Sequence, residues 1–366
     1  MGKGIALDFV FNKLMTMIKT EDITRTEISS LGEFSLINHL TKEFEIKNDS
    51  TVKGVGDDAA VIDSKGKHIV VSTDMLIEGV DFDMTYTPLR HLGYKAVAVN
   101  LSDIAAMNAI PKQITVNIAV SNRYSVEALS ELYAGIYLAC QRYDVDLVGG
   151  DTSASPMGMF ISITVVGEAI PDKLVYRNGA NVHDLICVSG DLGSAYSGLL
   201  ILEREKATFK ANPNYQPDLA TFDYVVDRYL KPEPRIDIVK FLEQKGVVPT
   251  SMIDVSDGLA SDVMQICKAS GVGCEIYEEK IPIDYATTMV CSEFGKMLPI
   301  SNALNGGEDY ELLFTIKQAD YEKIKDSIEV HVIGHITEAN MGMMLVTPQN
   351  TTIQLRAQGW SEQDEE

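Results

Sequence analysis

The stretch NLSDIAAM (100–107) places a serine and an aspartate side by side within an apolar run. Five further segments also combine a small or hydroxyl residue with a neighbouring acidic one. In each, a glycine, serine or threonine stands next to an aspartate or glutamate: GVGDDAAV (54–61), VVSTD (70–74), LVGGD (147–151), MIDVSDG (252–258) and NGGEDYE (305–311). Carboxylates gathered on tight turns repel one another unless a cation lies between them, and these segments contain no Lys, Arg or His. A cluster of divalent metal ions is the simplest cation to expect, and such clusters commonly hold phosphates.

The net charge narrows the range of partners. With 31 basic and 53 acidic residues, the 366-residue chain carries a formal charge of −22 at pH 7. This balance argues against non-specific nucleic-acid binding, which depends on Lys and Arg, and against adsorption to anionic membranes. We therefore expect neither partner. An anionic ligand would have to be neutralised locally, by metal ions, helix N-termini or a few placed bases.

The five cysteines are odd in number and no pair has Cys-x-x-Cys spacing, which argues against a disulfide framework or a zinc ribbon. Reduced core thiols in a cytoplasmic protein are the simpler expectation. Residues 1–30 are expected to form a leader without a role in the chemistry, and Asp8 interrupts their apolar stretch, unlike in a signal peptide. No run of about 18 apolar residues is present, so no membrane span is expected.

Strand-like and helix-like segments alternate from residue 31 onward, which indicates an α/β (α+β) fold. β-rich runs that end in turn residues predict strands at HIVVS (68–72), ITVNIAV (114–120), FISITVVG (160–167), LICVSG (185–190) and LLFTI (312–316). Apolar residues at helical spacing predict helices over 88–109, 125–141 and 259–270.

The chain length suggests two domains, and the turn-rich segment 168–184 is the expected boundary. We expect a leader (1–30), an N-terminal domain (31–170), a C-terminal domain (181–350) and a C-terminal segment with an acidic tail (351–366). The segment 205–235 contains four prolines and is expected to be a long excursion within the second domain.

Several familiar nucleotide and metal motifs are weak or missing. GVGDDA matches the dinucleotide fingerprint, but Asp57 and Asp58 would face the pyrophosphate where free backbone N–H groups are needed. The sequence has no Gly-x-x-x-x-Gly-Lys-Ser/Thr and no EF-hand spacing, and its six histidines form no paired set. A zinc or iron centre is therefore not expected.

Oxygen chemistry is what remains. The carboxylates expected to lie together, with oxygens of Ser72 and Thr73, are Asp58, Asp74, Asp103, Asp151, Asp254 and Asp257. Hard oxygen ligands suit Mg²⁺, Mn²⁺ or Ca²⁺. Because Mg²⁺ takes one or two carboxylates plus substrate phosphates, six dispersed carboxylates predict several ions around a polyphosphate. One such segment alone would more often be a turn or a helix cap. Six segments with the same arrangement of residues favour a metal-binding site.

A phosphate cradle is expected beside the metal ions. A helix that begins at Ser256 or Asp257 would face an anion with free N–H groups. The two glycines at 149–150, directly before Asp151, would let a ligand approach the backbone closely. Arg177 is the best-placed single base, although a surface-loop role is equally open. Two further residues fit ordinary structural roles more readily than ligand contacts: the core aromatic Tyr133 and the helix-face lysine Lys95.

Eight segments carry a family resemblance, in order and with consistent spacing: GEFSLI (32–37), GDDAAV (56–61), STD (72–74), YKAVAVNLSDIAAM (94–107), GGDTS (149–153), RNGA (177–180), IDVSDGL (253–259) and GGEDYEL (306–312). With these segments the chain resembles the thiamine-monophosphate kinase family, within the superfamily that includes aminoimidazole ribonucleotide synthetase and selenophosphate synthetase. The resemblance covers nearly the whole domain pair. GGEDYEL together with NLSDIAAM is highly specific, since neither is a generic nucleotide motif.

The resemblance implies a two-domain aminoimidazole ribonucleotide synthetase-like fold, with an N-terminal ATP- and Mg-binding domain that dimerises and an active site between the domains. It implies Mg²⁺-dependent transfer of the γ-phosphoryl group of ATP to thiamine monophosphate, giving thiamine diphosphate. Positions that match the family's metal ligands are Asp58, Ser72, Thr73, Asp74, Asp103, Asp151, Asp254 and Asp257.

The same resemblance assigns the two substrates. The positions that match ATP contacts are Tyr133, Gly150, Asp151, Arg177 and Ser256. The positions on the thiamine side are Asp81, Glu308 and Trp360. Trp360 stands where the chain departs from the family, whose members end in an aromatic-rich segment while this chain continues with SEQDEE.

A phosphate nucleophile is largely ionised at pH 7, since its second pKa is about 6, so no general base is expected. The metal cluster and Arg177 are expected to stabilise the transfer. Two alternatives stay open. Another ATP-using synthetase of the superfamily is disfavoured by GGEDYEL and by the lack of an N-terminal Cys for selenium chemistry, and a non-catalytic metal- or nucleotide-binding protein would bind ATP without releasing ADP.

Overall fold

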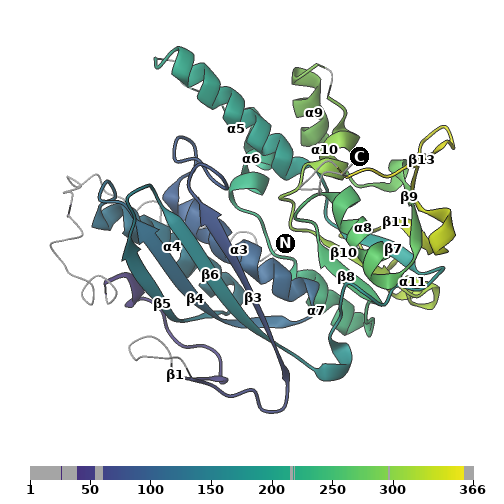
Figure 1. Ribbon diagram of the computed structural model, residues 1–366, viewed down its shortest axis with the longest axis horizontal. Helices are drawn as coiled ribbons and strands as arrows, with labels where there is room; N and C mark the ends of the chain where they lie inside the picture. The colour runs from purple at the N-terminus through teal and green to yellow at the C-terminus, as the bar shows by residue number, and fades with distance from the viewer. Residues whose placement is uncertain are drawn as a thin grey trace, which may run out of the picture.

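Two mixed sheets organise the described part of the chain in the computed structural model (Figure 1). The structure describes residues 26, 39–53, 61–214, 217, 219–295 and 297–357. A small antiparallel pair, β1 (Thr51–Lys53) and β2 (Val61–Ile62), precedes the first sheet.

The first sheet has four strands in the order β3-β6-β4-β5. They are β3 (His68–Ile77), β4 (Ile110–Val120), β5 (Asp146–Ala154) and β6 (Phe160–Ala169). The pairs β3–β6 and β4–β6 are antiparallel, and β4–β5 is parallel. This order leaves β3 and β5 at opposite edges.

Among the described residues, helices cover one face of this sheet. α3 (Leu89–Ala106) and α4 (Val126–Tyr143) lie behind it in Figure 1. The two helices cross at glycines, because a Cβ at Gly93 would lie 2.0 Å from the Leu132 carbonyl oxygen, and one at Gly135 would lie 1.9 Å from that of Arg90. Only a residue without a Cβ permits this approach.

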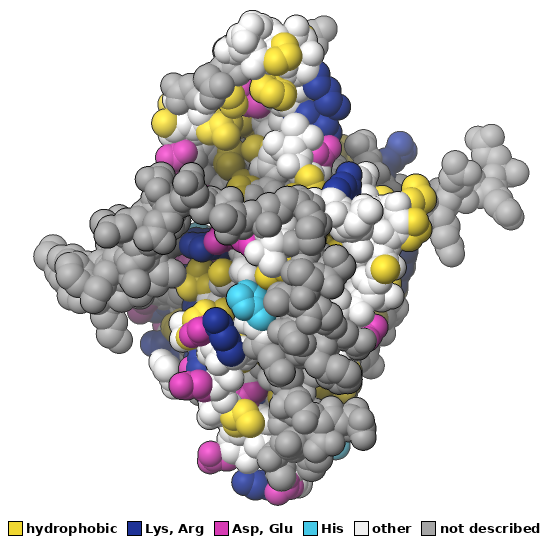
Figure 2. All heavy atoms as spheres, turned by 90° about the vertical axis from the view of Figure 1, so that its left-hand side faces the viewer, with side chains coloured by type: hydrophobic (Ala, Val, Ile, Leu, Met, Phe, Trp, Pro, Cys, Tyr) yellow, Lys and Arg dark blue, Asp and Glu magenta, His cyan; other side chains and the backbone are white. Residues whose placement is uncertain are grey.

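The other face of the sheet is open on β3. Successive strand residues point to opposite faces, so Ser72 and Asp74 lie on the helix side, whereas Val71, Thr73 and Met75 lie on the open side. Val71 is 60% exposed and Met75 is 56% exposed. The edge of the molecule that carries β5 and α4 shows basic and acidic side chains mixed with apolar ones over its described residues (Figure 2).

The second sheet has seven strands in the order β13-β12-β9-β11-β7-β10-β8. In chain order they are β7 (Leu185–Ser189), β8 (Ser251–Asp254), β9 (Gly273–Tyr277), β10 (Leu312–Ile316), β11 (Val330–Thr337), β12 (Met343–Val346) and β13 (Thr352–Gln354). Its helices are α5 (Ser194–Ala211), α6 (Asp223–Leu230), α7 (Ile236–Lys245), α8 (Leu259–Ser270), α9 (Tyr285–Glu293), α10 (Pro299–Asn305) and α11 (Tyr321–Ile324).

The strands β8 and β10 of the second sheet are buried on both faces. Along β10, Phe314 belongs to the large core shared with the first sheet and its helices, whereas Leu313 belongs to a separate core with residues of α8. The helix α3 contacts β3 and β6 on one side and β8, α6 and α7 on the other. It is therefore the element that joins the two halves of the molecule.

The predicted α/β class and the two-part organisation are confirmed. The five predicted strands correspond to β3, β4, β6, β7 and β10, with the predicted 185–190 strand ending one residue earlier at Ser189. The three predicted helices correspond to α3, α4 and α8. The segment 205–235 is not a long excursion, because it contains the end of α5 and all of α6. All five cysteines are free and buried, as predicted. In the described ranges, no helix has the length and apolar character needed to cross a bilayer.

Candidate functional site

Two of the acidic motifs lie side by side although about fifty residues separate them. The Tyr310 amide donates to the Val255 carbonyl oxygen at 2.9 Å, and the Glu308 amide donates to that of Ser256 at 2.8 Å. The Val255 amide donates to the Glu311 carbonyl oxygen at 2.7 Å, which continues the pairing of β8 with β10. The segments MIDVSDG and NGGEDYE are thus one structural unit.

Helix α3 connects this unit to the first sheet. On its β3 side, the Ser72 hydroxyl donates to the Asp103 carboxylate, and the Asp74 amide donates to Asn100 Oδ1 at 3.0 Å. On its β8 side, the Ser102 hydroxyl donates to Asp254 Oδ2 at 2.7 Å. Carboxylates from β3, α3 and β8 therefore meet between the two sheets, and Asp74, Asp103 and Asp254 are called the acidic cluster below.

The electrostatics of the acidic cluster confirm that its members crowd one another. Burial raises the pKa of Asp74 from 3.8 to about 6, with added contributions from the charges of Asp103 and Asp81. Burial and the charge of Asp103 raise the pKa of Asp254 from 3.8 to about 7. Burial also raises the pKa of Asp103, while the Ser72 hydroxyl and the Arg177 charge oppose the rise. A cation placed among these groups would be bound favourably.

Asp262 is a member of this region that the sequence analysis missed. It is only 2% exposed, and burial, together with the charges of Asp254 and Asp257, raises its pKa from 3.8 to about 8. Its Oδ2 accepts the Asp257 amide at 3.2 Å. The predicted helix does not open at Ser256 or Asp257, since α8 begins at Leu259, and at least one of the amides expected to face an anion is already bound by Asp262.

Lys95 is not the helix-face lysine that the sequence predicts. It is only 3% exposed, and its Nζ lies 2.5 Å from Glu308 Oε2 and 3.9 Å from the centroid of the Tyr229 ring. An ordinary helix-face lysine would project into water. This one crosses from α3 to the loop before β10 and places a positive charge beside the site.

The side chains of two predicted ligands point away from the acidic cluster. The Thr73 hydroxyl donates to the Ile163 carbonyl oxygen at 3.0 Å and accepts from Thr164 Oγ1 at 3.0 Å, on the open face of the sheet. Asp151 is exposed on β5, three strands away from β3. At about 4.8 Å per strand this is roughly 14 Å, so a single chain does not bring Asp151 to Asp74.

The other predicted substrate and metal contacts lie on separate elements of the fold. Tyr133 lies in α4 and is 7% exposed, where burial raises its pKa to about 12. Asp81 accepts the Ile77 amide at 2.7 Å in the turn after β3. Gly150 has φ = 157° and a Cβ there would lie 1.9 Å from the Val116 carbonyl oxygen. Asp58 and Trp360 lie outside the described residues.

The donor set suits Mg²⁺ better than a metal that needs a complete protein cage. Within the described ranges, no three His, Cys, Asp or Glu side chains stand ready to hold an ion on their own. The residues present offer hydroxyl and carboxylate oxygens, which Mg²⁺ binds in small number while keeping waters or taking substrate phosphates. The raised pKa values of the acidic cluster fit a site that a cation completes.

The family comparisons agree with this geometry. The description "AIR synthase related protein, N-terminal domain" matches residues 56–169, and "AIR synthase related protein, C-terminal domain" matches residues 181–348. The fold and the acidic cluster between its two sheets therefore define a protein of the AIR synthase related class.

Individual relatives narrow the class further. The thiamine-monophosphate kinase of Bacillus subtilis is 33% identical over 339 residues, covering 90% of this chain and 99% of the relative. That of Aquifex aeolicus is 36% identical over 312 residues, covering 85% and 93%. The chain belongs to the thiamine-monophosphate kinase family.

Solved structures support the same assignment. "AaThiL complexed with AMPPCP and TMP" is 32% identical with a TM-score of 0.70, covering 93% of this chain and 99% of that one. The thiamine-monophosphate kinase from Stenotrophomonas maltophilia is 30% identical with a TM-score of 0.74, covering 86% and 96%. The hydrogenase maturation protein HypE, at 19% identity and a TM-score of 0.69, shares the fold alone.

Proposed function

We propose that this chain transfers the γ-phosphoryl group of ATP to thiamine monophosphate, giving thiamine diphosphate and ADP, in a Mg²⁺-dependent reaction in the cytoplasm. The observation that carries the proposal is the meeting of Asp74, Asp103 and Asp254 between the two sheets. It is supported by relatives and a solved complex that match the chain over most of its length.

The proposed roles follow the family resemblance. Mg²⁺ would be held by Asp58, Ser72, Thr73, Asp74, Asp103, Asp151, Asp254 and Asp257. ATP would be contacted by Tyr133, Gly150, Asp151, Arg177 and Ser256, and thiamine monophosphate by Asp81, Glu308 and Trp360. Bound Mg²⁺ would supply positive charge that offsets the repulsion between the phosphate groups of the two substrates.

The chain's own residues set the geometry of the transfer. The Ser72 and Ser102 hydroxyls fix the orientation of the Asp103 and Asp254 carboxylates. Arg177 exerts its charge on Asp103, which supports the proposal that it stabilises phosphate charge beside the cluster. No general base is assigned, because the attacking phosphate is already ionised near pH 7. The task of the protein is to hold two polyanions in line.

A homodimer is part of the proposal. The open face of β3 exposes Val71 and Met75, and an unpaired apolar face of this kind favours a partner surface. Thr73 and Asp151 belong to the same open side of the sheet. Two such faces brought together would place the Thr73 and Asp151 of one copy near the strands of the other.

The domain limits are proposed as a leader (1–30), an ATP- and Mg-binding domain (31–170), a C-terminal domain (181–350) and a tail (351–366). The boundary between the two domains is supported by the gap between β6, which ends at Ala169, and β7, which begins at Leu185. At the other end, β13 extends the second sheet into the proposed tail.

The test is ADP release from MgATP with and without thiamine monophosphate, with the product identified by mass. Release that requires both Mg²⁺ and thiamine monophosphate, with an equal amount of thiamine diphosphate, would support the kinase. ADP release with a different phosphate acceptor would indicate another synthetase of the superfamily. ATP binding without ADP release under any of these conditions would indicate a nucleotide-binding protein.

A further inference from the structure

The loop before β10 has an unusual backbone. Gly307, Glu308 and Tyr310 have φ values of 68°, 64° and 52°. This left-handed region suits glycine but is unfavourable for other residues, so two non-glycine residues here require support from their surroundings. The loop carries Glu308, the proposed contact of thiamine monophosphate, and Tyr310, whose pKa is raised well above 10 by burial and by Glu308 and the acidic cluster.

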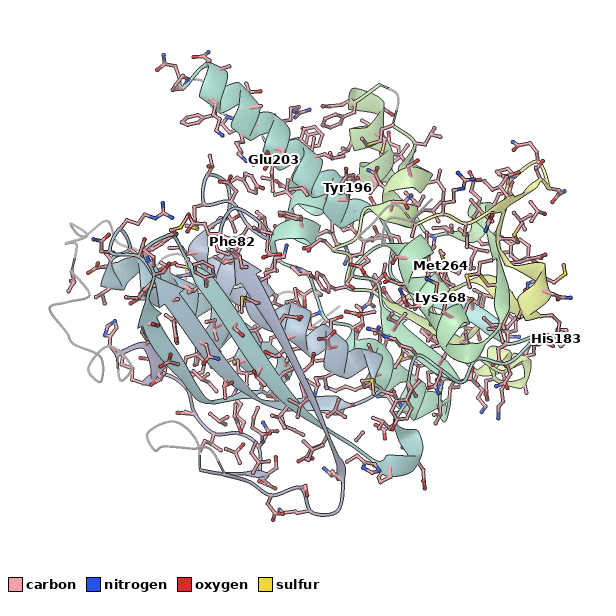
Figure 3. The ribbon with its side chains drawn as sticks, in the orientation of Figure 1. Phe82, His183, Tyr196, Glu203, Met264 and Lys268 are labelled. Carbon is pink, nitrogen blue, oxygen red and sulfur yellow. The ribbon has the colours of Figure 1, made fainter. Side chains whose placement is uncertain are left out.

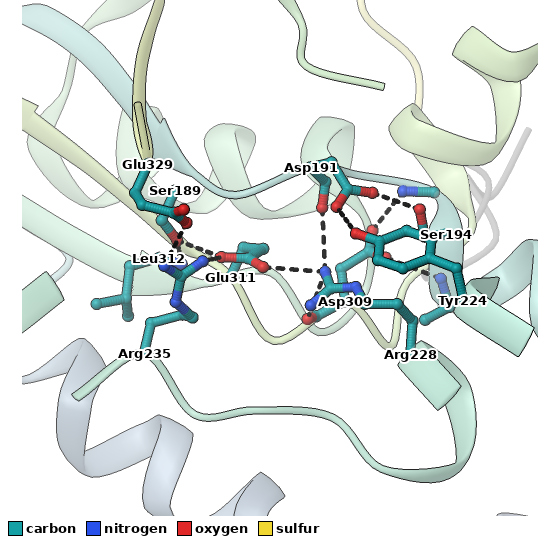
Figure 4. A network of polar contacts seen from close by, with 12 residues as sticks. Ser189, Asp191, Ser194, Tyr224, Arg228, Arg235, Asp309, Glu311, Leu312 and Glu329 are labelled. Atoms are coloured by element: carbon teal, nitrogen blue, oxygen red, sulfur yellow. Dashed lines mark hydrogen bonds and ion pairs between the residues drawn. The ribbon is translucent and has the colours of Figure 1, made fainter. Parts of the chain in front are cut away.

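Asp309 and Glu311, the other acidic residues of this segment, are buried. Glu311 is 1% exposed and its carboxylate is bound on both oxygens (Figure 4). Arg228 Nη2 lies 3.0 Å from Oε1, and Arg235 Nη1 lies 2.5 Å from Oε2. The Ser189 hydroxyl donates to Oε2 at 2.5 Å. Glu311, Arg228, Arg235 and Ser189 are called the Glu311 network below.

Asp309 ties the same loop to the start of α5. Its two oxygens accept the Gly193 amide at 2.7 Å and the Ala195 amide at 3.2 Å. Arg228 also reaches the backbone, donating to the Asp309 carbonyl oxygen at 3.4 Å. Beside it, a Cβ at Gly306 would lie 2.5 Å from the Cβ of Tyr196, which Figure 3 labels on α5.

Arg228 thus contacts the loop backbone at the Asp309 carbonyl and is itself held by the Glu311 carboxylate, while the Glu308 carboxylate pairs with Lys95. We infer that Arg228 and Glu311 are positioning residues for thiamine monophosphate, which hold Glu308 in its left-handed conformation so that its carboxylate meets the substrate. The inference rests on the proposed function. It assigns these two residues a role in substrate affinity in addition to stability.

The kinetic test uses Arg228→Lys and Glu311→Gln in the full chain. Arg228→Lys keeps the charge but loses the planar fork that spans Glu311 and the backbone carbonyls. For both variants we expect the KM for thiamine monophosphate to rise about tenfold, because small displacements of a substrate contact have large effects. The KM for ATP should change less than about twofold.

The matched control is Arg204→Lys, since Arg204 makes ion pairs with Glu205 and Glu293 in the same domain but does not contact the loop. This variant should leave both KM values unchanged. Glu311→Gln retains the shape of the side chain, so it serves where Arg228→Lys fails to fold.

A double-variant comparison separates positioning from general destabilisation. If Arg228 acts through Glu308, Arg228→Lys should have little further effect on the KM for thiamine monophosphate in a Glu308→Gln background. Effects that multiply in the double variant would overturn the inference. A lower melting temperature with both KM values unchanged would also overturn it, because it would mean a purely structural role.

A substrate-free measurement distinguishes failure of this inference from failure of the proposed function. Amide hydrogen exchange at residues 307–311 should be faster in Arg228→Lys than in the wild type, whereas exchange in α4 should be unchanged. Unchanged exchange in the loop would overturn the inference even in an active kinase. If the wild type does not phosphorylate thiamine monophosphate, the proposed function is refuted. The exchange measurement would still test whether Arg228 holds the loop.

Discussion

The molecule buries two groups of carboxylates in different ways. In the acidic cluster, Asp74, Asp103 and Asp254 raise one another's pKa values and are held by serine hydroxyls. In the Glu311 network, one carboxylate lies between two guanidinium groups, Arg228 and Arg235. The first group has an excess of negative charge, whereas the single carboxylate of the second is compensated by two arginines of the same chain.

The difference shows which carboxylates serve folding and which await a ligand. A buried charge is tolerated when opposite charge and hydrogen bonds surround it, and it is costly otherwise. The Glu311 network meets that condition without any other molecule. The acidic cluster meets it only in part, through Arg177 acting on Asp103. The cation brought with ATP would complete the charge compensation at the cluster.

The largest effect is expected at the acidic cluster. Asp103→Asn should lower the rate of thiamine diphosphate formation by about 10³-fold, in line with the loss of a group that stabilises transferring charge. The melting temperature of the metal-free protein should not fall, because the substitution removes a charge that repels Asp74 and Asp254. Turnover is followed by mass and stability by thermal unfolding.

Asp257→Asn and Asp58→Asn should show the same loss of turnover with the fold retained, since both residues are proposed ligands of the same ions. Asp172→Asn is the control, because Asp172 is an exposed residue of the short 3-10 helix Pro171–Lys173, which lies between β6 and β7. Near-normal turnover in the Asp58, Asp103 and Asp257 variants would sink the metal-cluster proposal.

The opposite result is expected in the Glu311 network. Glu311→Ala leaves Arg228 and Arg235 without their shared partner, and removing one member of a buried ion pair costs about 3–5 kcal/mol. We therefore expect a large fall in the free energy of unfolding, measured with urea in the absence of ligands. A fall of less than about 1 kcal/mol would mean that the two arginines find other partners, and the contrast with the acidic cluster would fail.

Local pattern was enough to predict much of the fold and part of the site. The strands at 68–72 and 312–316 and the helix around Asp103 were predicted because their apolar spacing is set within the segment itself. The acidic motifs were recognised from their composition. Of the predicted ligands, Ser72, Asp74, Asp103 and Asp254 are brought together by α3.

What local pattern missed depends on contacts between distant segments. Lys95 reads as an ordinary helical lysine until α3 packs against the loop that carries Glu308. Asp262 reads as a first-turn acidic residue, and only the fold reveals that Asp254 is its neighbour. Thr73 stands between two inward residues, so the alternation of β3 could have placed its side chain on the opposite face.

Asp309 has features of both the acidic cluster and the Glu311 network, and it gives a prediction about the pH dependence of stability. Burial raises its pKa from 3.8 to about 7, Asp191 adds to the rise, and Arg228 with the Gly193 and Ala195 amides opposes it. The folded state therefore retains a proton that the unfolded chain releases. This contribution to stability is present below about pH 4 and is lost as the pH rises to about 7.

Asp309→Asn removes this titration. Between pH 5 and pH 7, the unfolding free energy of the wild type should fall relative to that of the variant by up to about 3 kcal/mol. Above about pH 8 the difference should be constant, since Asp309 is then ionised in both states. Urea unfolding at several pH values measures this. A difference that does not vary with pH would contradict the assignment of a buried, protonated Asp309.

The smallest effect is expected at an exposed ion pair, which supplies the baseline for the comparison. Arg204 pairs with Glu293, whose side chain is 44% exposed. Glu293→Ala should change the unfolding free energy by less than about 1 kcal/mol, because water and salt already screen the pair. It should not alter turnover. A loss as large as that in Glu311→Ala would show that burial is not what separates the two sites, whereas a small loss leaves burial and charge matching as the cause.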